Sequence, residues 1–343
     1  MLGLARNLTL ALALGAGLAA PAAAQDRNIE LRFSHWVPAA HPLHGGGFTE
    51  WMNSIRQASN GTIRITLFPS EQLGRAADHY DMARNGIADI TYVNPGYTPG
   101  RFPVIALGEM PFLVANAKGG SQALAEWYRA YAEREMQGVR ACIVFAHDPG
   151  TFHMKREIRT PDQIRGLRIR AANGTIAQFV TSLGGTNVQV SAPEAREVLE
   201  RGIADGITFP WRSIMLFGID RVVSYSMDVP LYVSTFVIAI NPAALQRMSP
   251  AQRAVMDQHC TPEWSRRMAT GWADFEASGR TMLSERQGYN VYRLNPPELE
   301  QWRQAAAPLR ARWADDVRRA NAGNPDEIYD ALVQSLRRQE ATN

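Results

Sequence analysis

The sequence is poor in cysteine, with only Cys142 and Cys260 among its 343 residues. Two cysteines cannot build the dense disulfide framework of a small secreted domain, and no C-x-x-C motif is present. In an oxidising compartment the two could pair. However, Cys142 lies in the apolar stretch ACIVFA, which predicts a buried strand. We therefore expect two buried free thiols rather than a disulfide.

The motifs of common enzyme classes are also missing. The chain has no G-x-S-x-G elbow, no H-E-x-x-H and no Walker loop. His147 and Asp148 are neighbours, but adjacent strand residues point to opposite faces and would not form an acid/base couple. His35, His41 and His44 are close in sequence but have no acidic ligand nearby. We therefore expect no metal site and no cofactor.

Charge and long apolar runs are scarce as well. The formal net charge is only +3, without a dense basic run, so nucleic-acid binding is not expected. The first residues do carry an apolar run, Leu8 to Ala20, preceded by Arg6 and followed by alanines up to Ala24. This pattern predicts a signal peptide over residues 1–24, cleaved after Ala24. No later run reaches the roughly 18 apolar residues of a membrane span, so we expect an exported protein without membrane insertion.

What the sequence does contain is a regular alternation of strand and helix patterns. Ile29, Leu31 and Phe33 alternate with charged residues, and amphipathic helices follow this strand and later ones. Such alternation predicts an α/β fold with largely parallel sheets. A mature length of about 319 residues predicts two domains. A helix from Thr261 to about Gln287, on the order of 40 Å long, could run across both.

The segment RTPDQIRGLRIR ends a predicted strand on an arginine. Thr160 begins a T-P-D-Q capping box, and Gly166 can end the short helix in a left-handed conformation. Arg168 and Arg170 then alternate with apolar residues, as in a strand. A guanidinium held at a strand end suits a carboxylate, although a solvated surface pair is the more common role of such a residue. The strand pattern alone does not separate the two arginines.

Aromatic and neutral polar residues lie at or near the other strand ends, where α/β sheets bind ligands. The candidate ligand-binding residues, besides Arg170, are His35, Trp36, Asn94, Tyr97, His153, Phe209 and Trp211. One guanidinium among several rings suits a small anion held by one charge and by ring packing. The alternatives are that Trp36 and Trp211 are core residues and that Asn94 forms a turn.

The order of several segments resembles the solute-binding protein of TRAP (tripartite ATP-independent periplasmic, DctP-type) transporters. These segments are LRFSHWVPAAHPLH, LFPSEQLG, NGIADITYVNPG, RTPDQIRGLRIR, ERGIADG and NPAALQRMSPAQR. They cover nearly the whole mature chain. The resemblance implies a periplasmic protein whose two α/β domains, joined by a hinge and a long helix, close a cleft on an organic acid. The partner would be a TRAP membrane permease.

The resemblance also assigns roles to residues and approximate limits to the domains. It selects Arg170 over Arg168 as the partner of the ligand carboxylate, and it makes Asn94 a ligand contact. The expected domains are 27–149 plus about 236–275, and 150–235 plus about 276–343.

Two departures from the family pattern predict the character of the ligand. Phe209 stands where many members have an asparagine that contacts the ligand. The second arginine of sialic-acid-binding members is also absent, and Pro149, Gly150 and His153 occupy that stretch. Both changes remove polar groups and add apolar area, so we expect a monocarboxylate with a hydrophobic or aromatic body. The alternatives are a receptor for a sensor or for another tripartite carboxylate system, and a secreted enzyme.

Overall fold

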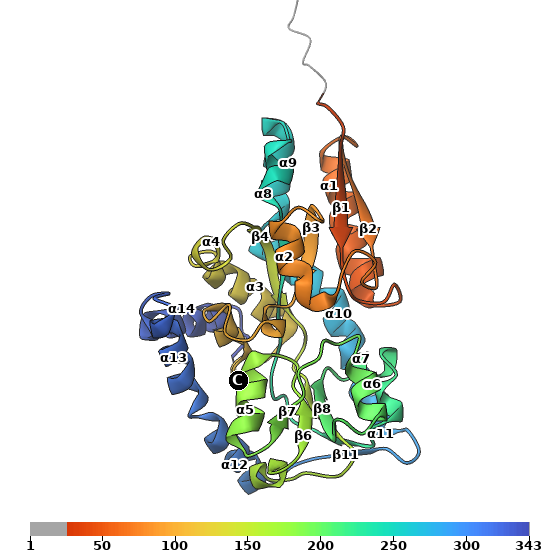
Figure 1. Ribbon diagram of the computed structural model, residues 1–343, viewed down its shortest axis with the longest axis vertical. Helices are drawn as coiled ribbons and strands as arrows, with labels where there is room; N and C mark the ends of the chain where they lie inside the picture. Colours follow the sequence, from red (N-terminus) through yellow and green to blue (C-terminus); the bar gives the residue numbers. More distant parts are fainter. Residues whose placement is uncertain (1–25, 343) are drawn as a thin grey trace, which may run out of the picture.

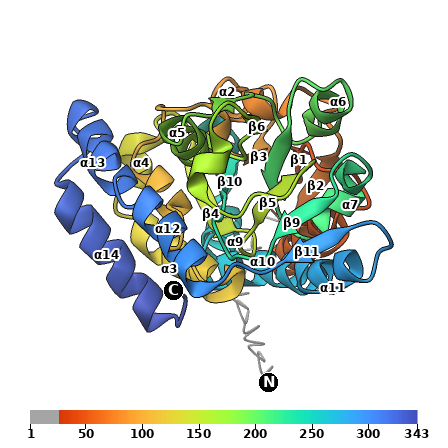
Figure 2. The same ribbon diagram turned by 90° about the horizontal axis from the view of Figure 1, so that it is seen from below.

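The computed structural model describes residues 26–342, so the predicted signal peptide lies outside the described residues. Two β-sheets with their covering helices form the upper and lower parts of the molecule in Figure 1. The chain crosses from the first sheet to the second after residue 146 and returns by residue 235. Figure 2 shows the C-terminal helices along one side.

The first sheet has five strands in the order β2-β1-β3-β10-β4. Its strands are β1 (Ile29–Ser34), β2 (Ile63–Phe68), β3 (Ile90–Val93), β4 (Arg140–Ala146) and β10 (Thr235–Ile240). β1 pairs in parallel with β2 and β3, whereas β10 runs antiparallel to β3 and β4. The apolar positions of β1 are buried and Glu30 and Arg32 are exposed, which confirms the predicted alternation.

The second sheet has six strands in the order β11-β9-β5-β8-β6-β7. Its strands are β5 (Thr151–Met154), β6 (Arg168–Arg170), β7 (Thr186–Asn187), β8 (Gly206–Phe209), β9 (Tyr225–Met227) and β11 (Asn290–Tyr292). β6 lies in parallel between β7 and β8. The carboxyl ends of β6 and β8 therefore lie side by side, which brings Arg170 close to Phe209.

Helices cover both sheets. They are α1 (Thr49–Ala58), α2 (His79–Arg84), α3 (Ala117–Tyr128), α4 (Ala132–Glu135), α5 (Gly174–Ser182), α6 (Ala195–Glu200), α7 (Ser213–Leu216), α8 (Pro242–Gln246), α9 (Pro250–His259), α10 (Pro262–Ala277), α11 (Gly279–Ser284), α12 (Pro296–Ala306), α13 (Leu309–Arg319) and α14 (Pro325–Arg338). Asn173, Ser249 and Thr261 cap α5, α9 and α10, and their side chains accept from backbone N–H groups in the first turn.

The helix α10 runs from the first sheet to the second, but it ends earlier than predicted. Near its start, Ser265 accepts a hydrogen bond from the backbone of β4, and near its end Glu276 accepts one from the backbone of Ser213 in α7. The helix is interrupted at Ser278, and α11 continues only to Ser284. A Cβ at Gly279 would lie 2.3 Å from the backbone nitrogen of Arg212. Glycine therefore allows close contact where the helix breaks.

Cys142 in β4 and Cys260 between α9 and α10 form a disulfide, so the expectation of free thiols is wrong. Burial itself was predicted correctly, since both residues are buried. The two cysteines are 118 residues apart, however, and an apolar pattern does not reveal which distant segment packs against it. The disulfide fastens the start of α10 to the first sheet.

Candidate functional site

One pocket brings together strand ends from both sheets. Trp36 follows β1 and Phe236 lies on β10, whereas Arg170 and Phe209 end β6 and β8. The pocket holds about 360 Å³ of space, including its open mouth. The other lining residues are His41, Asn94, Tyr97, His147, Ala172, Ala192, Pro210, Ser213, Phe217, Tyr232, Ser234 and Trp272.

Among residues 26–342, Arg170 is the one lysine or arginine that lines this pocket, and its charge is incompletely paired. The residue is 1% exposed. Its Nε donates to the carbonyl oxygen of Val190 at 3.0 Å, but Nη2 is buried without a hydrogen-bond partner among residues 26–342. A buried unpaired guanidinium is costly, so an anion that pairs with it gains the corresponding free energy.

Two tyrosines share the surroundings of Arg170. The hydroxyl oxygen of Tyr97 accepts from the backbone N–H of Ala192 at 3.0 Å. Burial raises the pKa of Tyr232 well above its ordinary value, although the charge of Arg170 opposes this, so Tyr232 stays a neutral donor. Its hydroxyl is buried without a partner within the described chain. Arg170 and Tyr232 thus offer two unused donors to an anionic group.

The frame that holds Arg170 agrees with the predicted one. A short helical turn, Pro161–Ile164, follows Thr160, and Gln163 accepts from the backbone N–H of Thr160 at 3.2 Å. Gly166 has a φ of +75°, the left-handed conformation predicted for it. The turn therefore ends where β6 begins, and Arg170 follows at the end of a three-residue strand.

Aromatic rings form the remaining walls. Trp36 stacks on Tyr92 at a centroid distance of 4.9 Å, and its Nε1 donates to the carbonyl oxygen of Tyr92. Phe236 lies 5.4 Å from Trp272, and the guanidinium of Arg170 lies 5.7 Å from the Phe209 ring centre. Because the indole N–H of Trp36 is already bonded, this residue presents apolar surface to a ligand.

Asn94 combines the two roles considered for it. Its Oδ1 accepts from the backbone N–H of Gly96 at 2.9 Å, which fixes the turn after β3. The residue also lines the pocket and is 5% exposed. An asparagine side chain has donors besides the bonded oxygen, so Asn94 can hold the turn and face a ligand at once.

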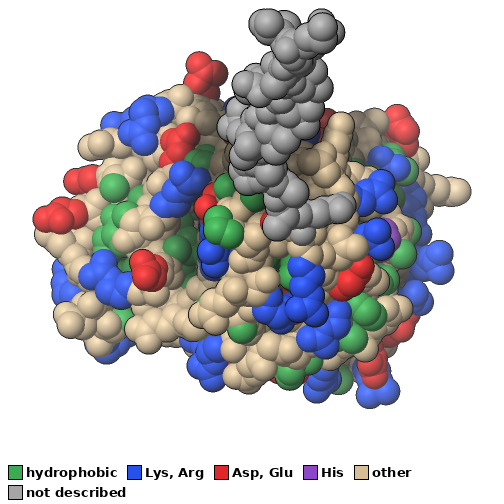
Figure 3. All heavy atoms as spheres, turned by 90° about the horizontal axis from the view of Figure 1, so that it is seen from above, with side chains coloured by type: hydrophobic (Ala, Val, Ile, Leu, Met, Phe, Trp, Pro, Cys, Tyr) green, Lys and Arg blue, Asp and Glu red, His purple; other side chains and the backbone are tan. Residues whose placement is uncertain are grey.

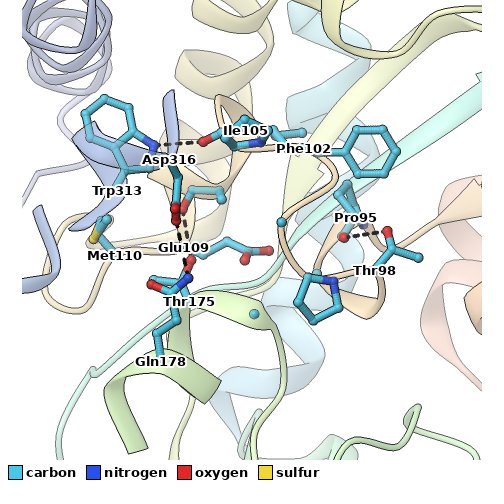
Figure 4. Close-up of a pocket in the computed structure, with 16 residues that line it drawn as sticks. Pro95, Thr98, Phe102, Ile105, Glu109, Met110, Thr175, Gln178, Trp313 and Asp316 are labelled. Carbon is cyan, nitrogen blue, oxygen red and sulfur yellow. Dashed lines mark hydrogen bonds between the residues drawn. The ribbon is translucent and has the colours of Figure 1, made fainter. Parts of the chain in front are cut away.

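A second hollow, shown in Figure 4, has the wrong charge for an organic acid. It is lined by Glu109 and Asp316 and by no lysine or arginine. Burial raises the pKa of Glu109 to about 8, and one of its oxygens already accepts from the backbone and hydroxyl of Thr235. Asp316 accepts from Gln178. An anion entering this hollow would meet carboxyl groups and no cation.

The described part of the chain, residues 26–342, has no group of three or more potential metal-ligating side chains. None of its helices is both long and apolar enough to cross a bilayer. Figure 3 shows acidic and basic side chains interspersed on the face seen from above.

The comparison with known families decides the identity. The model of bacterial extracellular solute-binding proteins, family 7 (DctP), matches residues 33–316. The chain belongs to this family. It has the two-domain α/β fold of TRAP periplasmic solute-binding proteins.

Individual relatives match over almost their whole length. A TRAP solute-binding protein from Rhodoferax ferrireducens T118, with copurified benzoate, is 25% identical, with a TM-score of 0.86 over 91% of this chain and 99% of that chain. One from Bordetella bronchiseptica, with bound (R)- and (S)-mandelate, is 26% identical, with a TM-score of 0.84 over 90% and 99%. The outer membrane transporter protein TsaT of Comamonas testosteroni is 22% identical over 330 residues, 93% of this chain and 96% of the relative.

The structure of this solute-binding protein brings five of the eight candidate residues to one pocket and leaves three outside it. The five are Arg170, Asn94, Trp36, Phe209 and Tyr97. Outside it, His35 contacts His44 at 2.9 Å, and His153 contacts Ser226 and the carbonyl oxygen of Phe209. Trp211 packs edge-on against His153. Because none of the three lines the pocket, we leave them out of the proposed ligand contacts.

Eleven of the sixteen lining residues of this family member were not selected from the sequence as ligand contacts, and four of these come from different parts of the chain. His41, Tyr232, Phe236 and Trp272 come from a loop, a connection between strands, a central strand and α10. Phe236 and Trp272 look like core residues in the sequence, and both are buried. Only the strand-end position of Phe236, next to the β4 end, could have suggested its role.

Proposed function

We propose that this solute-binding protein captures a small aromatic monocarboxylate and delivers it to a TRAP membrane permease. The observation that carries the proposal is the partly unpaired guanidinium of Arg170 inside an aromatic pocket. One buried cation matches one carboxylate, and the rings match an apolar body. The ligands of the Rhodoferax and Bordetella relatives, benzoate and mandelate, have this chemistry.

The two sheets would act as the halves of a closing cleft. We propose that the domains follow the expected limits, 27–149 plus about 236–275, and 150–235 plus about 276–343, with one exception. The last helix, α14, belongs with the first domain. The helix α14 packs on α3 beside the first sheet, where Trp127 donates to the carbonyl oxygen of Ile328 at 3.0 Å. It would therefore move with the first domain.

The proposed place of action is the periplasm. The support is the signal-peptide pattern of residues 1–24 and the disulfide between Cys142 and Cys260, which persists in oxidising compartments. A receptor for a sensor would need the same site and compartment, so a permease-dependent uptake assay in the source bacterium separates these two partners.

Catalysis is not part of the proposal, because the family consists of solute-binding receptors. His147, which was considered above for an acid/base couple, has a structural role. Its Nε2 accepts from the backbone N–H of Ser234 at 2.9 Å, and its Nδ1 donates to the carbonyl oxygen of Asp148. Both ring nitrogens are therefore engaged, and neither is free to transfer a proton.

A thermal-shift screen tests the proposal. Benzoate, mandelate, a sugar acid and an aliphatic dicarboxylate are compared at equal concentrations. A ligand present at a hundredfold excess over its Kd stabilises the folded state by about 2.7 kcal/mol. We expect the aromatic monocarboxylates to raise Tm, and stabilisation by only the sugar acid or the dicarboxylate would refute the proposal.

A further inference from the structure

His41 lines the ligand pocket and has a ring nitrogen without a hydrogen-bond partner among residues 26–342. It lies in the loop after β1 and is 2% exposed, edge-on to Trp272 at a centroid distance of 5.0 Å. Its Nδ1 accepts from the backbone N–H of Leu43 at 3.2 Å. Because a backbone N–H can only donate, Nδ1 carries no proton, and the neutral ring must carry its proton on Nε2.

The bond from Leu43 is the one hydrogen bond of the His41 ring within residues 26–342, and Nε2 is not among the sealed polar atoms that lack a partner, so its N–H group stays open to the pocket. Burial lowers the pKa of His41 to about 3, so the ring is neutral at physiological pH. His147 lines the same pocket, but both its nitrogens are engaged. His41 is therefore a neutral donor without a partner, on the wall formed by the first sheet and α10, whereas Arg170 belongs to the second sheet.

We propose that His41 recognises an uncharged acceptor oxygen, such as a ring hydroxyl, on the aromatic body of the ligand. The inference rests on the proposed function, in which Arg170 and Tyr232 take the carboxylate. A second carboxylate is disfavoured at this end, because Arg170 is the pocket's one lysine or arginine and a neutral imidazole cannot balance another buried charge. The preferred class is thus the hydroxy-substituted aromatic monocarboxylates.

Two substitutions at His41 distinguish its proposed hydrogen bond to the ligand from its hydrogen bond to the backbone of Leu43. His41→Asn places an amide oxygen where Nδ1 accepts from Leu43 but removes the donor at Nε2. His41→Gln instead places an amide nitrogen near the Nε2 position. Calorimetric titrations of benzoate, 3-hydroxybenzoate and 4-hydroxybenzoate into the wild type and both variants give the affinity ratio of each hydroxy acid to benzoate.

We expect the wild type to bind at least one hydroxybenzoate about three- to tenfold more tightly than benzoate, the factor of one net hydrogen bond. In His41→Asn this ratio falls to about one, and His41→Gln restores part of it. Equal ratios in the wild type and His41→Asn, or equal weakening of all three acids, would overturn the inference. If benzoate and both hydroxybenzoates fail to bind the wild type, the proposed function falls with it.

Discussion

Arg168 and Arg170 show how neighbouring residues of one strand acquire different roles. The guanidinium of Arg168 makes two hydrogen bonds to the carboxylate of Asp205, at 3.0 and 2.7 Å, and its side chain is 48% exposed. Arg170 is buried and keeps Nη2 unpaired. A solvent-exposed pair contributes little to stability, whereas a buried unpaired donor gains a full charge-assisted bond from a ligand.

Replacing Arg170 by alanine should abolish tight binding and leave the fold intact. Removing one partner of a buried ion pair costs on the order of 3–5 kcal/mol, so affinity for benzoate should fall by more than about a hundredfold. Calorimetry measures the affinity, and circular dichroism checks the fold. The matched control is Arg168→Ala, which removes the same side chain two residues earlier and should leave affinity within about twofold. Unchanged affinity in Arg170→Ala would contradict the assignment.

Strand-end position allowed Asn94, Trp36 and Phe209 to be selected from the sequence, because parallel strands end at the same edge of a sheet. The choice of Arg170 over Arg168 came from the family resemblance. His41 could not be selected in this way. Its proposed role depends on a proton at Nε2, which follows from the hydrogen bond that Nδ1 accepts from the backbone N–H of Leu43. This contact forms only when the loop folds.

At the scale of elements, the disulfide and the break after α10 determine how the long helix is held. Cys260 fastens the start of α10 to β4, and Gly279 sits against the backbone of Trp211 and Arg212 where the helix breaks. Helix propensity predicted the element and its cap at Thr261 correctly. It did not predict the break at Ser278, because the break depends on packing against a distant segment.

Removing the disulfide should destabilise the protein without changing the pocket. In the chain-entropy model a loop of about 100 residues corresponds to about 4.7 kcal/mol, so the Cys142→Ser/Cys260→Ser variant should lose several kcal/mol. Urea unfolding measures the loss, and reduced wild type serves as the comparison. Benzoate affinity should remain, since neither cysteine lines the pocket. Equal unfolding free energies of the oxidised protein and the variant would contradict this expectation.

Alanine at Gly271 in α10 and alanine at Gly279 in α11 should have opposite effects. Gly279→Ala places a methyl group within 2.3 Å of the backbone of Arg212 and should destabilise the protein, because backbone must shift. Gly271→Ala, in α10, meets nothing within 4 Å and should stabilise by up to about 1 kcal/mol through helix propensity. Thermal unfolding of both variants checks this, and a stabilising Gly279→Ala would contradict the close contact.

At the scale of the whole molecule, buried neutral histidines predict loss of stability in acid. Burial lowers the pKa of six of them: His35 and His41 to about 3, His79, His147 and His153 to about 4, and also that of His259. Below their ordinary pKa of about 6.5, these histidines are protonated in the unfolded chain but stay neutral in the folded protein. Each histidine thus lowers the free energy of unfolding by at most about 1.4 kcal/mol per pH unit between about 6.5 and its folded pKa.

Glu109 acts in the opposite direction. Its raised pKa, about 8, makes the folded protein hold a proton that the unfolded chain loses above its own pKa, so its contribution is lost as pH rises toward 8. Burial also raises the pKa of Glu135, Asp148 and Glu276, and the six histidines outnumber these four carboxyl groups below pH 6.5. Urea unfolding at pH 7, 6 and 5 should therefore give a falling free energy, and a constant value would show that the histidines are not buried as described.

The overall α/β organisation followed from the alternation of strands and helices, and the two-domain fold followed from the length and the family resemblance. The assignment of α14 could not follow from sequence, because a C-terminal amphipathic helix can pack on either half. Its position on α3 emerges only from the folded chain.

The most direct measurement for the whole account is a crystal structure of the protein with a bound aromatic monocarboxylate. We predict that the carboxylate lies within hydrogen-bond distance, about 2.7–2.9 Å, of Nη2 of Arg170, with the ring between Trp36, Phe236 and Trp272. A ligand that occupies the hollow beside Glu109, or that leaves Nη2 of Arg170 unpaired, would contradict the central claim.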